Sequence, residues 1–161
     1  MSRLEPRGER FLLAFFIGVI MSAFEEIDLF ATSAPTEAQQ ELLQKLREEP
    51  TEENLWQCII AFQGTLFYTS RGLPFSYSLK RGRRGEYTKE LFIDRRENSK
   101  SLAWSSVRMA FRKAMEQHGA IFARPKEIAD VRGVSYSYSL LWRFGLIRVP
   151  EGVAAKLQGG L

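Results

Sequence analysis

Residues 66–95 read LFYTSRGLPFSYSLKRGRRGEYTKELFIDR, and this stretch decides the fold class. It contains three short runs of aromatic and β-favouring residues, LFYTS at 66–70, FSYSLK at 75–80 and KELFIDR at 89–95. The connections RGLP and RGRRGEY contain glycine, which gives the backbone the freedom that tight turns require. We therefore predict three antiparallel strands, with residues 81–85 at the tip of the second hairpin.

Helical patterns flank the predicted strands on both sides. On the N-terminal side, Pro35 opens a helix that Pro50 stops, and Thr51 is placed to cap a further helix over residues 53–63. On the C-terminal side, SLAWSSVRMAFRKAMEQ at 101–117 has the spacing of an amphipathic helix. This order predicts an α+β domain with N-terminal helices, a small three-stranded antiparallel sheet and C-terminal helices.

Length and composition are those of one globular domain. The chain has 161 residues, of which 45% are hydrophobic and 26% are charged. We expect a single domain with an acidic helical part over 1–63 and a basic β-meander plus helices over 64–161. Cys58 is the only cysteine, so no internal disulfide can form, and its apolar neighbours in LWQCIIAF predict a buried thiol. This cysteine usage suits a reducing cytoplasm.

The most apolar run is FLLAFFIGVIMSAF at residues 11–24. It resembles the apolar part of a signal peptide, but Glu5 and Glu9 precede it and the charged EEID at 25–28 follows it. It is also shorter than the ~20 residues that a transmembrane helix needs. We expect a helix buried in the core or in a homodimer interface, and no membrane association.

The charge is unevenly distributed along the chain. Residues 1–70 hold 5 Lys or Arg and 11 Asp or Glu, whereas residues 71–145 hold 16 and 7. A segment this basic attracts polyanions, although a solvated surface with internal ion pairs is the alternative interpretation. The predicted nucleic-acid contacts are Lys80, Arg81, Arg83 and Arg84 around the hairpin tip, together with Arg95, Arg96, Arg108, Arg112 and Lys126.

PKEIADVRGVSYSYSLLWRFGLI at residues 125–147 resembles the helix-turn-helix pattern of DNA-binding domains. Ile128 and Ala129 match the packing positions of its first helix, and Gly133 falls four residues after Ala129, where a left-handed turn is needed. Ser135 is placed to cap the second helix. The resemblance implies that the start of this helix meets base edges, and an ordinary helical corner is the alternative. The residues it nominates are Tyr136, Ser137 and Tyr138.

A broader resemblance covers roughly residues 55–150. GLPFSYSLK, ELFIDRRENSKSLAWSSV and DVRGVSYSYSLLWRFGLI are similar to segments of small proteins met in gut Firmicutes genomes, often near mobile elements. This resemblance implies a bacterial, mobile-element setting but no particular activity. DNA-binding regulators and anti-defence inhibitors are both frequent in such a setting.

The sequence offers little for catalysis. His118 is the only histidine, and one histidine and one distant cysteine cannot build a metal site. GRRG at 82–85 lacks the strand–loop–helix setting of a phosphate-binding loop. Asp94 and Glu97 alternate with arginines, which favours surface ion pairs over a metal-dependent nuclease. We therefore expect no enzymatic activity, no metal and no cofactor.

Two functional hypotheses follow from the sequence. The first is a non-enzymatic nucleic-acid-binding protein, with DNA favoured over RNA. The second is a protein-interaction module, such as an anti-defence inhibitor that docks on a bacterial nucleoprotein complex. In the second case Tyr87, Tyr136 and Tyr138 would be expected to lie on the surface as contact residues.

Overall fold

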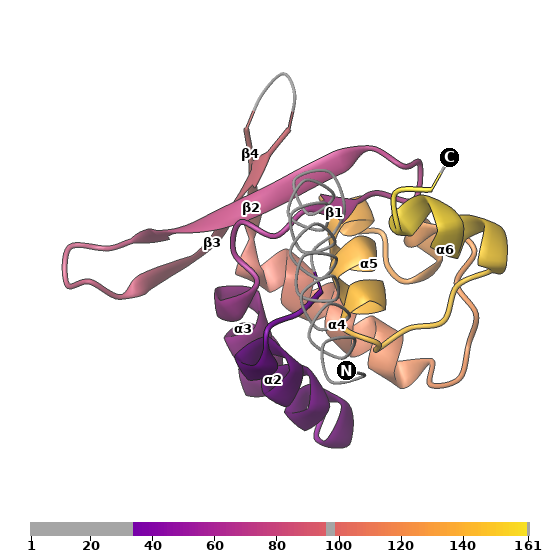
Figure 1. The fold of residues 1–161 in the computed structure, drawn as a ribbon, viewed down its shortest axis with the longest axis horizontal. Helices are drawn as coiled ribbons and strands as arrows, with labels where there is room; N and C mark the ends of the chain where they lie inside the picture. Colours follow the sequence, from indigo (N-terminus) through magenta and orange to yellow (C-terminus); the bar gives the residue numbers. More distant parts are fainter. Residues whose placement is uncertain (1–33, 96–98, 161) are drawn as a thin grey trace, which may run out of the picture. The chain divides into compact units, whose positions relative to one another are not determined.

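Strands β2 (Pro74–Arg81) and β3 (Tyr87–Asp94) pair antiparallel and form the centre of a four-stranded sheet (Figure 1). The shorter strands β1 (Phe67–Tyr68) and β4 (Lys100–Ala103) pair with its edges, in the order β1-β2-β3-β4. The structure is a computed structural model that describes residues 34–95 and 99–160. The predicted antiparallel meander is confirmed.

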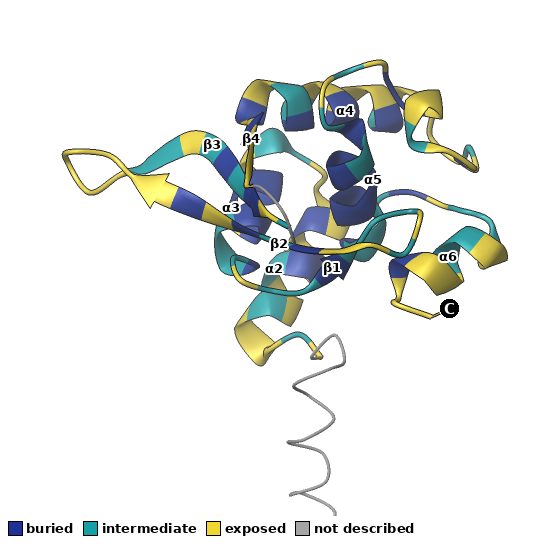
Figure 2. Cartoon of the chain, turned by 90° about the horizontal axis from the view of Figure 1, so that it is seen from above, coloured by how far each residue is buried: buried dark blue, intermediate teal, exposed yellow. Residues whose placement is uncertain are grey.

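One face of the sheet is apolar. The residues that this face buries include Tyr77, Leu79, Leu91, Ile93 and Leu102. They alternate along each strand with residues that are half-buried or exposed, as the period-two geometry of a strand requires. In Figure 2 the buried positions lie where the strands meet the helices, and the tip of the β2–β3 hairpin is exposed.

The helices lie before and after the sheet in the sequence. They are α2 (Glu37–Glu48), α3 (Glu52–Ala61), α4 (Trp104–Glu116), α5 (Val134–Arg143) and α6 (Glu151–Leu157), with a short 3-10 helix, η1, at Pro125–Glu127. Thr36 caps α2 through a reciprocal capping box with Gln39, and Thr51 accepts a hydrogen bond from the backbone of Asn54 at the start of α3. The α+β class and the two helices predicted between Pro35 and residue 63 are confirmed.

Aromatic side chains fix the helices to the sheet. The rings of Phe62, after α3, and Phe144, after α5, lie 5.1 Å apart between their centroids. The Tyr77 hydroxyl donates a hydrogen bond of 2.6 Å to the backbone oxygen of Ile59, which joins β2 to α3 in the core. All residues over 136–141 are buried, so α5 is the central helix of the described fold.

Two predictions are wrong over the same residues: the sheet has four strands and not three, and the helix does not begin at residue 101. Residues 100–103 form a fourth strand, and α4 begins only at Trp104. The reason is tertiary: Leu102 pairs with Leu91 of β3 and is buried, while its neighbours Ser101 and Ala103 are exposed. This alternation suits an edge strand, and burial of Leu102 overrides the local helical pattern.

The segment over 125–147 contains one α-helix, α5, and not the two helices that the resemblance implies. Where its first helix was expected there is the three-residue helix η1, and the left-handed Gly133 (φ 71°) is the residue that caps α5. The predicted left-handed glycine is confirmed, but Ser135 lies inside α5 and does not cap it. Gly145 follows the end of α5 with φ 79°, the left-handed conformation in which many helices end.

Cys58 has the environment that its apolar neighbours predict. It is fully buried, and its Sγ donates a hydrogen bond of 3.4 Å to the backbone oxygen of Leu42. Burial raises the pKa of the Cys58 thiol to about 11. The thiol is therefore a packing group in the structure.

Part of the sequence prediction lies outside the described residues. This is so for the apolar helix expected at 11–24 and for the homodimer contact assigned to it. The described residues belong to one compact unit. Within them, no helix combines the length and the apolar character needed to cross a membrane.

We expect Gly133→Ala to destabilise the protein by about 2–4 kcal/mol. The left-handed conformation disfavours any residue with a Cβ by about 1–2 kcal/mol, and a Cβ here would also lie 2.5 Å from Cδ1 of the buried Leu102. Denaturant unfolding measures the loss. Gly119→Ala is the matched control, because Gly119 has φ 84° but a Cβ at this position would meet no atom within 4 Å. Equal losses in the two variants would show that contact with Leu102 contributes nothing.

Candidate nucleic-acid interface

The tip of the β2–β3 hairpin is a well-defined turn. Gly82 N–H donates to the Glu86 oxygen at 2.7 Å, and Gly85, with φ 82°, donates to the Gly82 oxygen at 3.0 Å. Arg81 braces this turn: its guanidinium donates to the Gly85 oxygen at 2.9 Å and to the Tyr87 hydroxyl at 3.0 Å. The tip is therefore held in one shape before any partner arrives.

The cations of the hairpin fall into two groups. Lys80 lies over the ring of Phe92, with Nζ 4.0 Å from the centroid, and Lys89 lies over Trp56 at 3.7 Å. Such contacts hold a long side chain against the sheet without neutralising its charge. Arg83 and Arg84 are exposed, and within the described residues neither has a hydrogen bond or an ion pair. The structure thus brings together the four predicted tip residues and leaves these two unpaired.

The other predicted contacts lie elsewhere. Arg108 and Arg112 of α4 both pair with Glu52 of α3, so they tie two helices together, with 3.7 Å from Arg108 Nε to the carboxylate. Arg95 is half-buried at the far end of β3, where its guanidinium lies 5.8 Å from the ring of Tyr136. Lys126 is exposed on η1. Arg96 lies outside the described residues.

The base-contacting role predicted for Tyr136, Ser137 and Tyr138 disagrees with their burial. Tyr136 is only 7% exposed, and Ser137 and Tyr138 are inaccessible. The start of α5 faces the core because the helix is covered on nearly all sides, and the same burial removes Tyr136 and Tyr138 from the surface contacts expected for a protein-interaction module. Tyr87 is half-buried, so part of it is accessible at the surface.

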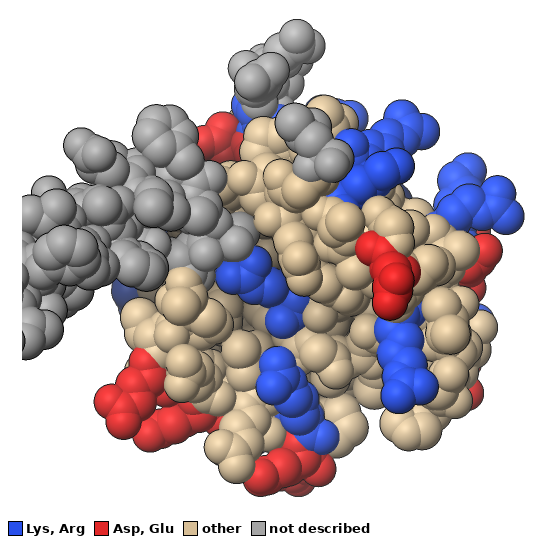
Figure 3. Space-filling view, turned by 45° about the vertical axis from the view of Figure 1, so that its right-hand side comes forward, with Lys and Arg blue, Asp and Glu red and all other residues tan. Residues whose placement is uncertain are grey.

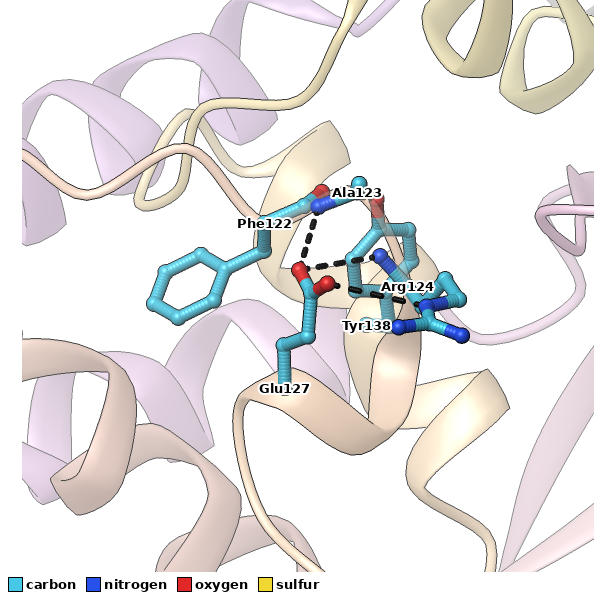
Figure 4. A network of polar contacts seen from close by, with 5 residues as sticks. All are labelled: Phe122, Ala123, Arg124, Glu127 and Tyr138. Carbon is cyan, nitrogen blue, oxygen red and sulfur yellow. Dashed lines mark hydrogen bonds and ion pairs between the residues drawn. The ribbon is translucent and has the colours of Figure 1, made fainter.

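A polar network holds the segment before η1 against α5 (Figure 4). The Tyr138 hydroxyl donates a hydrogen bond of 2.6 Å to the Phe122 oxygen. The Glu127 carboxylate accepts from the backbone N–H groups of Ala123 at 2.7 Å and Arg124 at 3.3 Å, and pairs with the Arg124 side chain at 3.6 Å. Burial, and then the charge of Glu127, raises the pKa of Tyr138 to about 12.

This network borders a groove that the sequence did not predict. The groove has a volume of about 1020 Å³ and lies among the β1–β2 turn, the segment 123–127, the start of α5 and α6. Its basic residues are Arg71, Arg95, Arg124, Lys126 and Lys156, of which Arg95 and Lys126 are among the contacts predicted from the sequence. They come from distant parts of the chain, so no local motif brings the whole set together. Figure 3 brings the side of the molecule with α6 forward, and Lys and Arg side chains recur over that face, some beside a recess.

Comparison with protein-family models, with curated proteins and with solved structures gives no match to this chain. Within the described ranges, no group of three or more His, Cys, Asp or Glu residues is placed to hold a metal ion. The features that bear on function are the geometry and charge of two basic surfaces, the hairpin tip and the groove.

Tyr138→Phe should destabilise the protein by about 1–3 kcal/mol, because the Phe122 oxygen loses its buried hydrogen-bond donor. Tyr136→Phe is the control, since the Tyr136 hydroxyl makes no hydrogen bond within the described residues, and its effect should stay within ~0.5 kcal/mol. Chemical denaturation distinguishes the two. If both tyrosines instead read bases, both variants would keep their stability and lose nucleic-acid affinity.

The raised pKa of Tyr138 predicts a loss of stability at alkaline pH. The folded state keeps the phenol proton up to about pH 12, whereas an unfolded tyrosine loses it near its ordinary pKa of 10.0. Between these values the unfolded state binds fewer protons, so the free energy of unfolding falls as pH rises. The free energy of unfolding, measured by denaturant titration at several pH values between about 10 and 12, should fall less steeply with pH in Tyr138→Phe than in the parent. Parallel curves would contradict the assignment.

Proposed function

We propose that the protein binds nucleic acid, that binding rather than catalysis is its activity, and that the β2–β3 hairpin is the arm that makes the contact. The observation that carries the proposal is the pair Arg83 and Arg84, exposed at the end of a projecting, preformed turn and without a partner in the described part of the chain. A guanidinium there keeps all its donors for a phosphate.

The surroundings of the tip support an electrostatic role. Lys80, Arg81 and Lys89 stand behind the tip on aromatic rings, so their charges are fixed near the contact with little side-chain freedom left to lose. Glu86 is the acidic residue of the turn, and within the described residues no ion pair joins it to the tip arginines. Contacts between such cations and phosphates give affinity for nucleic acid but discriminate little between base sequences.

The shape of the arm favours DNA over RNA. A two-stranded antiparallel ribbon fits the major groove of B-form DNA, which is ~12 Å wide. The major groove of an A-form RNA helix is too deep and narrow for side chains to enter. We therefore propose double-stranded DNA as the ligand of the arm, held mainly through phosphates.

Replacing both Arg83 and Arg84 by Ala should weaken DNA binding for all sequences alike. The slope of log affinity against log salt concentration should fall by about one unit for each lost phosphate contact, about two in all. Stability should change little, because each side chain is exposed and unpaired. Fluorescence anisotropy with duplexes of unrelated sequence, over a range of salt concentrations, measures the slope.

The matched control is Lys113→Ala/Arg148→Ala, which removes the same net charge from exposed positions on α4 and before α6. This variant should retain most of the salt dependence of the parent. An equal loss of slope in both variants would assign binding to overall charge, and the proposed role of the hairpin would be wrong. Absence of DNA binding by the parent at low salt would overturn the proposed function itself.

A further inference from the structure

The groove lies at the other end of the strands from the hairpin tip. Its wall includes residues 69–71 and Leu73, which precede β2, whereas the tip follows the end of β2 at Arg81. A smaller cavity adjoins it, with Arg95 and Tyr136 in both linings, and adds Lys100 and Arg132 to the basic surroundings. The groove is thus a surface separate from the proposed DNA-binding arm.

The lining of the groove includes a set of aliphatic side chains, namely Leu73, Val131, Val134 and Val153. Leu73 is 60% exposed, which makes it one of the most exposed large hydrophobic residues of the described chain. Its side chain contributes little to the core, because most of its surface remains in contact with water. An exposed leucine inside a concave, partly apolar surface is typical of a binding site.

The same groove carries a strong positive charge. Arg71, Arg124, Lys126 and Lys156 are exposed around it, and Glu127 is the acidic residue in its lining. Two backbone N–H groups and the Arg124 side chain already occupy the Glu127 carboxylate. The net field in the groove therefore attracts negatively charged groups.

The walls of the groove are preformed. In the β1–β2 turn, Thr69 N–H donates to the Leu73 oxygen at 2.9 Å, and the Thr69 hydroxyl accepts from the N–H groups of Arg71 and Leu73 at 3.3 Å and 3.2 Å. The opposite wall is held by the Glu127 and Tyr138 contacts shown in Figure 4. Little ordering of the protein is then needed on binding, which favours affinity.

We propose that this groove binds an acidic amphipathic peptide segment of a partner protein. Its aliphatic or aromatic side chains would cover Leu73 and the valines, and its carboxylates would meet the surrounding cations. Because the groove is both positively charged and lined by aliphatic side chains, a matching ligand combines carboxylates with apolar side chains. The inference does not depend on DNA binding by the hairpin.

A nucleic-acid strand matches the groove less well. It would satisfy the cations, but single strands bind protein largely by stacking bases on exposed aromatic rings. Tyr136 is the aromatic residue in the groove lining, and it is only 7% exposed. A strand lying here would leave the exposed Leu73 side chain against sugar and phosphate.

A phage-displayed library of random peptides tests the proposal. The full chain is the target, and Leu73→Ser is used for counter-selection. We expect recovered peptides that combine Asp or Glu with aliphatic or aromatic residues. Recovery of no peptide, or of peptides without acidic enrichment, would overturn the proposal.

A synthetic peptide of the recovered sequence then locates the site. Leu73→Ser and Arg71→Ala/Lys156→Ala should each weaken its binding about ten-fold or more. The controls Ile121→Ser, at a residue that is 63% exposed outside the groove, and Lys113→Ala/Arg148→Ala should bind like the parent. Equal binding by Leu73→Ser and the parent would overturn the assignment.

Single-stranded DNA is the competitor that separates the two kinds of ligand. If it displaced the peptide and its own affinity fell in Leu73→Ser, the groove would be a nucleic-acid site and the peptide proposal would fail. If Arg83→Ala/Arg84→Ala binds the peptide as tightly as the parent does, the peptide proposal is supported, because that variant removes only charges at the hairpin tip.

Discussion

The register of β2 against β3 is the constraint on which both the core and the proposed arm depend. Pairing of Tyr77 with Ile93 and of Leu79 with Leu91 buries these four side chains on one face. A slip of one residue in either strand would turn its two buried side chains to the solvent face. The register shifts between Leu79 and Arg81, and residues 81–86 beyond that point are all exposed. The irregularity thus separates a packed half of the hairpin from a free half.

Two buried tyrosines couple the helices to the segments that carry the surfaces. Tyr77 donates to a backbone oxygen at the end of α3, and Tyr138 donates to the Phe122 oxygen beside the groove. Each satisfies a main-chain acceptor that lies away from water. Burial raises the pKa of both phenols, so each remains a donor across the neutral range. The main-chain oxygens of Ile59 and Phe122 are therefore paired beneath the two surfaces.

The sequence predicts those parts of the fold that local pattern determines. Alternation located β2 and β3, the prolines at 35 and 50 located α2, the cap at Thr51 located α3, and the glycine spacing located the left-handed Gly133. Contacts between distant residues decided the rest. Pairing with Leu91 makes Leu102 part of a strand, and Glu52 engages Arg108 and Arg112, which the sequence assigned to phosphates. The groove was not predictable, because its cations come together only in the folded chain.

The separation of the two surfaces has a consequence for how the proposed ligands would interact. β2 has eight residues, and at ~3.3 Å per residue it places the tip on the order of 25 Å from the turn that forms the groove wall. This distance exceeds a Debye length of about 8 Å at physiological ionic strength, so charge bound at one surface is largely screened at the other. DNA at the tip and an acidic peptide in the groove would then neither compete nor repel one another strongly. A chain with both surfaces would join a protein partner to DNA.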